Sequence, residues 1–375
     1  MKVKSIKLKP WLARTLEALG IIFCICLGIF LFYQKQLSDL KKIGYSQVAS
    51  ERIFFSKHKD YVMSLGENRT INAAFESDQY KEKYLDNYAK IKYVDHKDLI
   101  SNINKLLKIG YSNNDINILL SHGTNEAVTE FTKRDRVHYL EEFYSYDFAK
   151  LENYDRYVQY SDEYGTDELD TIIYVNLNID KEPYENYETI TTFSYDMLIN
   201  KYRALSEDFV PNDLVVVDRN YASDDDYQLN RVTYNALVEM IKAADQEGYQ
   251  LIVNSGYRSY QDQVDLVELY RNTYGQSYVD KYVAKPGFSE HQTGLAFDIG
   301  SRNSNVFANS KEYTWMKENA HKYGFIMRYD ERYEDITRFR SEPWHYRYVG
   351  KEIAKYIYEH NNMSLEEYFV IHLDK

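Results

Sequence analysis

The chain has 375 residues, of which 44% are hydrophobic and 28% are charged, and its formal net charge is −12. This composition supports a packed core, which excludes a wholly disordered chain and a collagen-like repeat. The negative charge argues against a nucleic-acid partner, because proteins that bind nucleic acids meet the phosphates with a basic surface. The length indicates two domains, or one domain with a long appendage.

The N-terminal segment predicts a membrane anchor. Residues 1–14 carry five basic side chains and no acid, and an uncharged run follows from Leu19 to Tyr33. Extended back to residue 15, this run approaches the roughly 20 residues that a helix needs to cross a bilayer. The basic flank favours the cytoplasm, so we expect a single-pass protein of the cell membrane, with residues 1–14 inside, 15–33 in the bilayer and the rest outside. A cleaved signal peptide is the alternative, but no small-x-small cleavage site follows the run.

Residues 34–170 predict a mainly helical, Tyr-rich spacer outside the membrane. This region contains no proline, and the only cysteines of the chain, Cys24 and Cys26, precede it. No disulfide or thiolate metal site can therefore form beyond the membrane segment. Apolar periods on both sides of Gly110 and Ser112 predict two short helices, with the glycine ending the first and the serine capping the second. A binding module is the alternative, although no site chemistry is visible here.

The pattern changes near residue 171, where we expect the functional domain to begin. Ile172 to Ile179 alternates β-branched residues and predicts a strand. A capping box at Ser364 begins a last short helix. Because helices and strands alternate without a regular βαβ rhythm, we predict an α+β domain over residues 171–375, with a small antiparallel sheet and flanking helices. The other predicted helices cover 230–247, 259–274 and 310–323, and the other predicted strands cover 251–254, 325–329 and 344–349.

Two histidines and an acid in this domain suggest a metal site. A turn at Gly294 would bring His291 and Asp298 to one point. His345 lies on a later predicted strand. Two imidazole nitrogens and one carboxylate oxygen are ordinary ligands for catalytic zinc, with the fourth position left to water. Such a site also needs a base, for which Glu342 is the nearest candidate. Spacing alone does not single out these residues, because a lone histidine is more often a surface or core residue.

Three segments together resemble one family. They are S-G-Y-R-S-x-Q-x-Q from Ser255 to Gln263, S-x-H-x-x-G-x-A-x-D from Ser289 to Asp298, and E-P-W-H from Glu342 to His345. In this order they are similar to the VanY/LdcB group of bacterial cell-wall carboxypeptidases, which are zinc enzymes of the D-Ala-D-Ala metallopeptidase superfamily. The resemblance covers about residues 171–358 and leaves the anchor and the spacer outside. No metal or base position departs from the family pattern.

The resemblance implies the metal ligands and the base. It implies that His291, Asp298 and His345 bind Zn²⁺. Glu342 would act first as the general base and later as the acid that protonates the leaving amine. The family fold would place this zinc site on the small antiparallel sheet.

The resemblance also implies a clamp for the end of the substrate peptide. Arg258 would pair with the free C-terminal carboxylate, which its planar guanidinium group suits. Ser289 and Gln263 would add hydrogen bonds to the same group. Two further acids within the motifs, Asp262 and Glu290, are interpreted as solvated neighbours.

These expectations describe a membrane-anchored zinc D,D-carboxypeptidase that removes the C-terminal D-amino acid from peptidoglycan stem peptides outside the cytoplasm. The alternatives are an L,D-carboxypeptidase acting on tetrapeptide stems and a non-catalytic cell-wall-binding protein of the same fold. D,D and L,D enzymes share the motifs, so the sequence does not separate them. Peptidoglycan stems and the membrane are the expected partners, nucleic acid is not, and the sequence identifies no protein partner.

Overall fold

The computed structural model describes residues 9–374, and the chain divides into two compact units, Met1–Glu152 and Asn153–Lys375. Of the segment predicted to lie in the cytoplasm, residues 1–8 are outside the described residues. The division falls within the region predicted as a spacer. Helices α10 (Tyr154–Tyr164) and α11 (Glu168–Asn176) consequently belong to the second unit.

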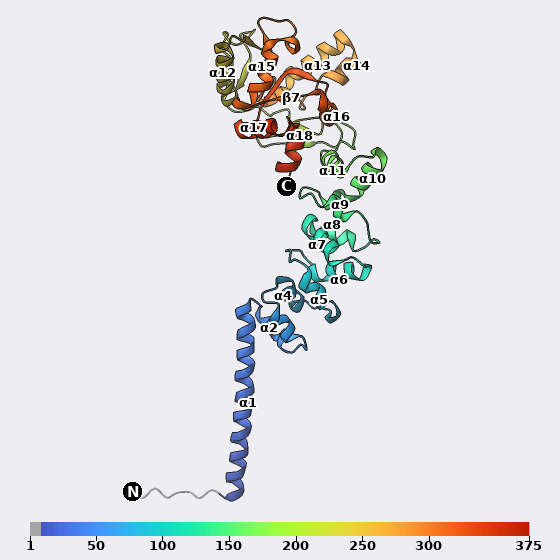
Figure 1. Ribbon diagram of the computed structural model, residues 1–375, viewed down its shortest axis with the longest axis vertical. Coiled ribbons are helices and arrows are strands. Elements are labelled where there is room, and N and C mark those ends of the chain that lie inside the picture. Colours follow the sequence, from blue (N-terminus) through green and yellow to red (C-terminus); the bar gives the residue numbers. More distant parts are fainter. Residues whose placement is uncertain (1–8, 375) are drawn as a thin grey trace, which may run out of the picture. The chain divides into compact units, whose positions relative to one another are not determined.

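The first unit begins with the long helix α1 (Pro10–Ile43), which extends away from the short helices that follow it (Figure 1). Within the described residues, it is the one helix long and apolar enough to cross a membrane. Its apolar side chains face outward, for example Phe23 and Ile29, which are 66% and 63% exposed. A helix that is apolar on all sides needs an apolar environment, although a signal sequence has the same properties.

Short helices make up the rest of the first unit. The two predicted helices on either side of Gly110 are confirmed: Gly110 ends α6 with a φ of 110°, and Ser112 caps α7 in a capping box with Asp115. Side-chain amides also join helices that are not consecutive, as where Asn87 Nδ2 donates to Asn113 Oδ1 at 2.9 Å. The helices after α1 are α2 (Gln47–Phe54), α3 (Lys59–Ser64), α4 (Arg69–Glu76), α5 (Leu85–Lys90), α6 (Leu99–Ile109), α7 (Asn113–His122), α8 (Asn125–Phe131) and α9 (Leu140–Phe143).

The second unit is built around a four-stranded antiparallel sheet with the strand order β5-β6-β8-β7. This confirms the predicted small antiparallel sheet with flanking helices. Two pairs of three-residue strands stand apart from it, one parallel and one antiparallel. The strands are β1 (Glu188–Ile190), β2 (Arg203–Leu205), β3 (Leu214–Val216), β4 (Gln228–Asn230), β5 (Leu251–Ser255), β6 (Ala296–Ser301), β7 (Phe325–Tyr329) and β8 (Glu342–Tyr348).

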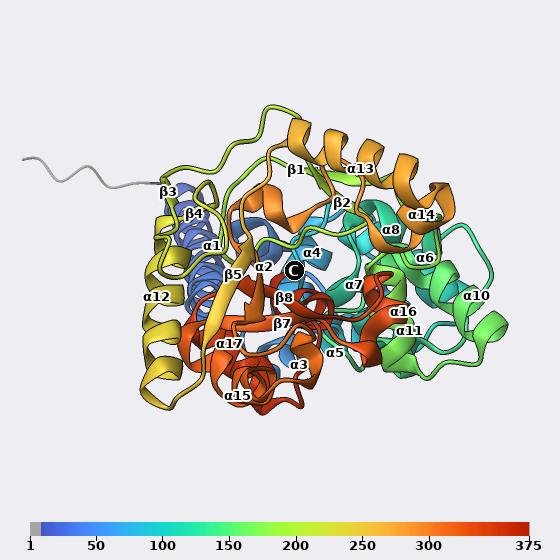
Figure 2. The same ribbon diagram turned by 90° about the horizontal axis from the view of Figure 1, so that it is seen from above.

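Helices cover one face of this sheet and leave the other for the site. Met240 of α12 and Trp315 of α15 belong to the same buried cluster as Phe297 and Ile299 of β6. Figure 2 shows α12 alongside β5. Because side chains alternate along a strand, Asp298 points to the face opposite to this core. The helices are α12 (Arg231–Gln246), α13 (Tyr260–Tyr274), α14 (Gln276–Tyr282), α15 (Lys311–Asn319), α16 (Glu334–Thr337), α17 (Lys351–Glu359) and α18 (Leu365–Tyr368).

One predicted strand is wrong. The run from Ile172 to Ile179 was expected to be extended, but most of it lies in helix α11. Asp167 caps this helix by accepting a hydrogen bond from the backbone N–H of Asp170 at 2.9 Å. A short apolar run fits a buried helix as well as a buried strand, and here the cap at Asp167 favours the helix.

Candidate metal and substrate site

The predicted metal ligands meet on the face of the sheet opposite to the core. Asp298 in β6 and His345 in β8 are direct partners across the antiparallel pair, so their side chains lie on the same face. His291 reaches them from the single turn of 3-10 helix Glu290–Thr293. Gly294 ends this turn with a φ of 67°, a conformation that glycine adopts without strain, and the chain then enters β6.

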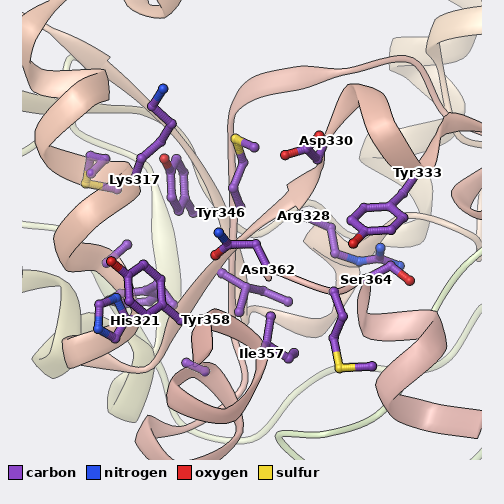
Figure 3. A pocket seen from close by; sticks show the side chains of 17 residues that line it. Lys317, His321, Arg328, Asp330, Tyr333, Tyr346, Ile357, Tyr358, Asn362 and Ser364 are labelled. Atoms are coloured by element: carbon purple, nitrogen blue, oxygen red, sulfur yellow. The ribbon is translucent and has the colours of Figure 1, made fainter. Parts of the chain in front are cut away.

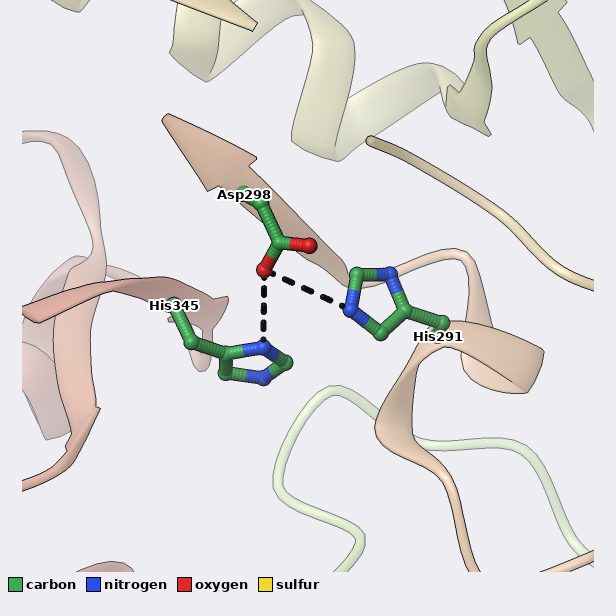
Figure 4. Close-up of side chains that lie close together, drawn as sticks. All are labelled: His291, Asp298 and His345. Carbon is green, nitrogen blue, oxygen red and sulfur yellow. Dashed lines mark hydrogen bonds and ion pairs between the residues drawn. The ribbon is translucent and has the colours of Figure 1, made fainter. Parts of the chain in front are cut away.

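The three side chains point toward a common centre (Figure 4). Asp298 Oδ1 lies 3.5 Å from Nε2 of His291 and 3.2 Å from Nδ1 of His345. One ligand atom from each residue lies within 4.8 Å of the others. Bonds of about 2.0–2.1 Å in a tetrahedral zinc site keep the ligand atoms about 3.4 Å apart. The three residues therefore fit a zinc ion.

The second ring nitrogen of each histidine is held by an acceptor. His291 Nδ1 donates to the carbonyl oxygen of Gly256 at 2.6 Å, and His345 Nε2 donates to Oε2 of Glu290 at 3.3 Å. Carbonyl and carboxylate oxygens only accept, so each of these ring nitrogens carries a proton. The bonds turn Nε2 of His291 and Nδ1 of His345 toward Asp298, the orientation that a metal ligand needs.

The pKa values of the three predicted ligands are shifted by burial and by their charged neighbours. Burial, aided by the charge of Arg258, lowers the pKa of His291 to about 4. Burial alone would also lower the pKa of His345, but its bonds to Asp298 and Glu290 raise it to about 9. Burial opposes ionisation of Asp298, yet the two histidines hold the pKa of this carboxyl well below its usual range. A metal ion entering the site would therefore replace the proton of His345.

Glu342, the predicted base, lies beside the ligands because β8 is irregular. In a regular strand Glu342 and His345, three positions apart, would point to opposite faces. The pairing of β7 with β8 shifts register, however, with Met327 opposite Tyr346 and Tyr329 opposite Glu342. This bulge redirects the strand, and Glu342 Oε2 lies 3.8 Å from Nδ1 of His345. Burial raises the pKa of Glu342 to about 7, near the value that suits a general base at neutral pH.

Arg258, the predicted clamp, is held in place by its neighbours. Its Nε donates to Oε1 of Gln263 at 3.1 Å, and its Nη1 donates to Oγ of Ser255 at 2.8 Å. Gln263 Nε2 in turn donates to the carbonyl oxygen of Ala284 at 2.8 Å. The amide of Gln263, which was predicted to contact the substrate, thus orients Arg258. Among residues 9–374, Nη2 of Arg258 has no hydrogen-bond partner, so it is available to a ligand.

All the predicted site residues line one cavity of about 550 Å³. They include the predicted cation, the predicted base and the three predicted metal ligands, and Trp344, 43% exposed, lines the cavity as well. Such a cavity suits a short peptide with a free carboxylate. The predicted residues in its wall are Arg258, Gln263, Ser289, His291, Asp298, Glu342 and His345, and the aromatic ones are Tyr270, Tyr278, Tyr282, Tyr329, Phe339 and Trp344.

A second, smaller cavity of about 80 Å³ lies on the other face of β8 (Figure 3). Tyr346, the neighbour of His345, faces this cavity because side chains alternate along the strand. Helices α15 and α17, strand β7 and the segment before α18 contribute to its wall. None of the predicted site residues lines it, so it is separate from the predicted metal site.

The prediction that Glu290 is solvated is wrong, because its side chain is fully buried. Its Oε1 accepts hydrogen bonds from Nε of Arg328 at 2.8 Å and from Nη1 of Arg347 at 2.9 Å. Arg328 also pairs with both carboxylate oxygens of Glu366 in α18, at 2.8 and 2.6 Å. Burial would raise the pKa of Glu290, but the two guanidinium groups hold it well below its usual range. Sequence spacing carries no signal for this cluster, since the arginines lie 38 and 57 positions further along the chain.

Comparison with known proteins places this site in a family. Residues 226–351, which include all the predicted site residues, match the VanY family, described as D-alanyl-D-alanine carboxypeptidase. The chain is 43% identical over 180 residues to the putative carboxypeptidase YodJ of Bacillus subtilis (strain 168), covering 46% of this chain and 66% of that protein. It is 34% identical over 178 residues to VanXYC of Enterococcus gallinarum, a bifunctional D-Ala-D-Ala dipeptidase and D-Ala-D-Ala carboxypeptidase, covering 46% of this chain and 91% of that protein.

Among solved structures, that of the LdcB LD-carboxypeptidase is 41% identical, covers 49% of this chain and 90% of that one, and has a TM-score of 0.45. The chain spans 66% of the length of the Bacillus relative, and 52% and 56% of two further curated relatives. The helices of the first unit lie outside the family match. The resemblance inferred from the three motifs is thus confirmed, and the chain belongs to the VanY family of D-alanyl-D-alanine carboxypeptidases.

Proposed function

We propose that the chain is a membrane-anchored zinc D,D-carboxypeptidase that removes the C-terminal D-amino acid from peptidoglycan stem peptides. The observation that carries this proposal is the convergence of His291, Asp298 and His345 beside Glu342, in a cavity that also contains Arg258. The carboxypeptidase names of the relatives support the same reaction.

Helix α1 is the proposed anchor, with its basic flank in the cytoplasm and the second unit outside. Its length and apolar composition support a span. The excess of Lys and Arg in residues 1–14 supports the orientation, because such residues stay on the cytoplasmic side. The active site would then face the cell wall, where its substrate is concentrated.

His291, Asp298 and His345 are the residues that would hold the metal ion. When bound there, zinc supplies Lewis-acid chemistry that lowers the pKa of a water molecule and polarises a carbonyl group. Imidazole and carboxylate ligands suit zinc, and three protein ligands leave the open position of a catalytic site. The chain has no cysteine beyond the membrane segment that could provide an alternative thiolate site.

Glu342 moves the proton during hydrolysis. Its carboxylate accepts a proton from the attacking water as the new C–O bond forms at the carbonyl carbon of the last peptide bond. The same carboxyl group then donates this proton to the departing nitrogen as the C–N bond breaks, and the terminal D-amino acid leaves with a neutral amine. Glu342 suits this role because it lies next to His345 and outside the set of three ligands.

Arg258 accounts for the removal of a single residue. Its guanidinium group would bind the terminal carboxylate of the peptide in a bidentate or charge-assisted pair. The backbone N–H of Arg258 donates to the carbonyl oxygen of His291 at 3.3 Å, so the clamp and a metal ligand are adjacent in the cavity. A peptide held by its carboxylate would therefore present its last peptide bond to the metal ligands and to Glu342.

Removal of the clamp should weaken hydrolysis strongly. We expect Arg258→Ala to raise KM, lower kcat and cost about 2–5 kcal/mol of transition-state binding on peptides with a free C-terminus. Steady-state kinetics on a pentapeptide and on its C-terminal amide will check this. The amide lacks the carboxylate, so the variant and the parent should hydrolyse it equally slowly. An unchanged kcat/KM on the free acid would contradict the clamp.

The bond that is cut can be identified directly. The full chain, in detergent with zinc, is incubated with synthetic pentapeptide and tetrapeptide stems, and the products are weighed by mass spectrometry. A D,D-carboxypeptidase shortens the pentapeptide by one D-residue, whereas the L,D alternative shortens the tetrapeptide. If zinc binds but neither stem is cut, the proposed enzyme is refuted in favour of a wall-binding protein.

Glu290 is proposed as the positioning residue of His345. The bond from His345 Nε2 to Glu290 keeps Nδ1 directed at Asp298, and carboxylate partners of this kind strengthen metal binding by a histidine. Arg328 and Arg347 fix the other carboxylate oxygen of Glu290. The orientation of His345 therefore depends on a buried ionic cluster that does not itself touch the metal position.

We expect Glu290→Gln to weaken zinc affinity about 10- to 100-fold. An amide has one acceptor, so Gln could accept from His345 or from the two arginines, but not from both. Glu366→Gln is the matched control, because it also removes a charge that Arg328 pairs with but does not contact His345. Chelator competition should show a loss of affinity in the first variant only, while thermal unfolding reports the stability of both. Equal losses of zinc affinity would contradict a positioning role.

A further inference from the structure

We infer that an aromatic cluster at the end of the exposed apolar stretch of α1 lies in the interface of the lipid bilayer. This cluster, the aromatic foot, consists of Tyr33 in α1, Phe54 at the end of α2 and Phe55 directly after it. The ring centroids of Tyr33 lie 4.9 Å from those of Phe54 and 6.0 Å from those of Phe55, and the two phenylalanines are 5.0 Å apart. The inference rests on the proposed anchoring by α1, and it adds a second membrane contact made by the folded first unit.

The surroundings of α1 change at the level of the foot. Before Tyr33, the large apolar side chains of α1 are exposed, such as Phe32 at 56%. Beyond it, Leu37 and Leu40 are buried, at 4% and 0%. The apolar side chains of α1 are exposed before Tyr33 and covered by protein after it. This change is expected where a helix leaves the lipid and enters a folded domain. Tyr33 therefore marks the outer boundary of the bilayer.

After α1 ends, the chain folds back, and the end of α2 lies beside Tyr33 again. Helix α2 packs against α1, as Figure 1 shows, and its C-terminal end meets Tyr33, well before the end of α1. Lys59 at the start of α3 donates from Nζ to Oε1 of Gln36 in α1 at 2.8 Å, so the segment between Phe54 and Lys59 stays at this level. The loop between α2 and α3 is thus held beside the end of the span.

Phe55 is unsuited to water in this position. It is 77% exposed, the highest value among the exposed large apolar side chains of the described residues. Aromatic rings gather at the boundary between lipid and water, and long basic side chains beside them extend toward the headgroups. Lys35, which is exposed, lies two positions after Tyr33. We assign the bilayer as the occupant, and not a protein partner, because the foot is continuous with the span and lies at its boundary.

The insertion depth of the foot can be measured with nitroxide labels. Cys24 and Cys26 are the only cysteines of the chain, so Cys24→Ala with Cys26→Ala gives a background free of reactive thiols. Single cysteines are then introduced as Phe55→Cys, as Tyr139→Cys at a site 60% exposed in the same unit, and as Ile29→Cys at a site 63% exposed in α1. The full chain is reconstituted in vesicles of phosphatidylethanolamine and phosphatidylglycerol. Collisions of each label with oxygen, which enters lipid, are compared with collisions with a water-soluble nickel chelate.

We expect the ratio of oxygen collisions to nickel collisions at position 55 to be several-fold higher than at position 139 and closer to the ratio at position 29. Equal ratios at 55 and 139, with a lipid value at 29, would overturn the aromatic foot and leave the anchor intact. Low collision with both reagents at 55 would also overturn it, because the label would then be buried in protein. A low oxygen-to-nickel ratio at position 29, as for a label in water, would refute the anchor and the aromatic foot with it.

Discussion

Glu342→Gln should lower kcat by about 10²- to 10⁴-fold and leave zinc bound. The amide has nearly the shape of the carboxylate but cannot take a proton from water or return it to the departing amine. Zinc should remain, because Glu342 Oε2 is 3.8 Å from Nδ1 of His345 and Glu342 is outside the group of three ligands. The check is a pair of measurements on one sample, namely the bound zinc by elemental analysis and the rate on a pentapeptide stem.

Glu331→Gln provides the control for this variant. Glu331 is an exposed acid that lies outside the cavity of the metal site, so its removal should change neither zinc content nor rate. A Glu342→Gln protein that hydrolysed the stem at the parental rate would remove Glu342 from the mechanism. Loss of zinc together with activity would instead make Glu342 a ligand, which also contradicts the proposed role.

His345→Ala and His291→Ala should each lose zinc and, with it, detectable hydrolysis. Each change removes one of three protein ligands and leaves a gap next to Asp298, whose negative charge the histidines stabilise. Zinc affinity should fall at least 100-fold. Loss of a residue that only hydrogen-bonds to a ligand already lowers metal affinity by up to about 100-fold, and loss of the ligand itself should cost more. Chelator competition measures this loss without relying on activity.

His360→Ala is the control for the histidine variants. His360 is exposed and makes its ring contact with Tyr356 in α17, away from the metal ligands. This variant should bind zinc and cut peptide like the parent. Tight zinc binding by either His291→Ala or His345→Ala would show that the ion is held elsewhere, and the proposed centre would be abandoned.

The local parts of the site were open to prediction from sequence. His291, Gly294 and Asp298 lie within one motif, and the glycine turn that joins the two ligands is found in the structure. His345 is different, because only strand pairing places it opposite Asp298, and no spacing rule gives that register. Its assignment came from the resemblance of the three motifs taken together, and its role as a ligand stays a prediction.

Elements with caps and a long apolar period were predicted closely. Helix α12 covers Arg231–Gln246 where 230–247 was expected, and α13 covers Tyr260–Tyr274 where 259–274 was expected. Strands β1 to β4 have three residues each, too few for an alternation to be visible. The apolar run from Ile172 failed for a related reason, since a few β-branched residues fit either a strand or the buried face of a helix.

Two features of the site depend on contacts between distant residues. Glu342 faces His345 because the pairing of β7 and β8 is irregular, and the bulge cannot be read from either strand alone. Glu290 looks solvated in its motif because its neighbours are polar, whereas Arg328 and Arg347 bury it in the fold. A charged residue is assigned to the surface by default, and only its distant partners reverse that assignment.

The buried cluster behind Glu290 also determines how the catalytic half could be excised. Arg347 Nη2 donates to the carbonyl oxygens of Tyr195 and Met197 at 3.2 and 2.8 Å, and Arg328 needs the carboxylate of Glu366. A fragment cut to the family-matched stretch 226–351 would leave both guanidinium groups with Glu290 but would remove their other partners, and breaking the buried Arg328–Glu366 pair costs about 3–5 kcal/mol. An autonomous fragment must therefore start before residue 195 and end after residue 366.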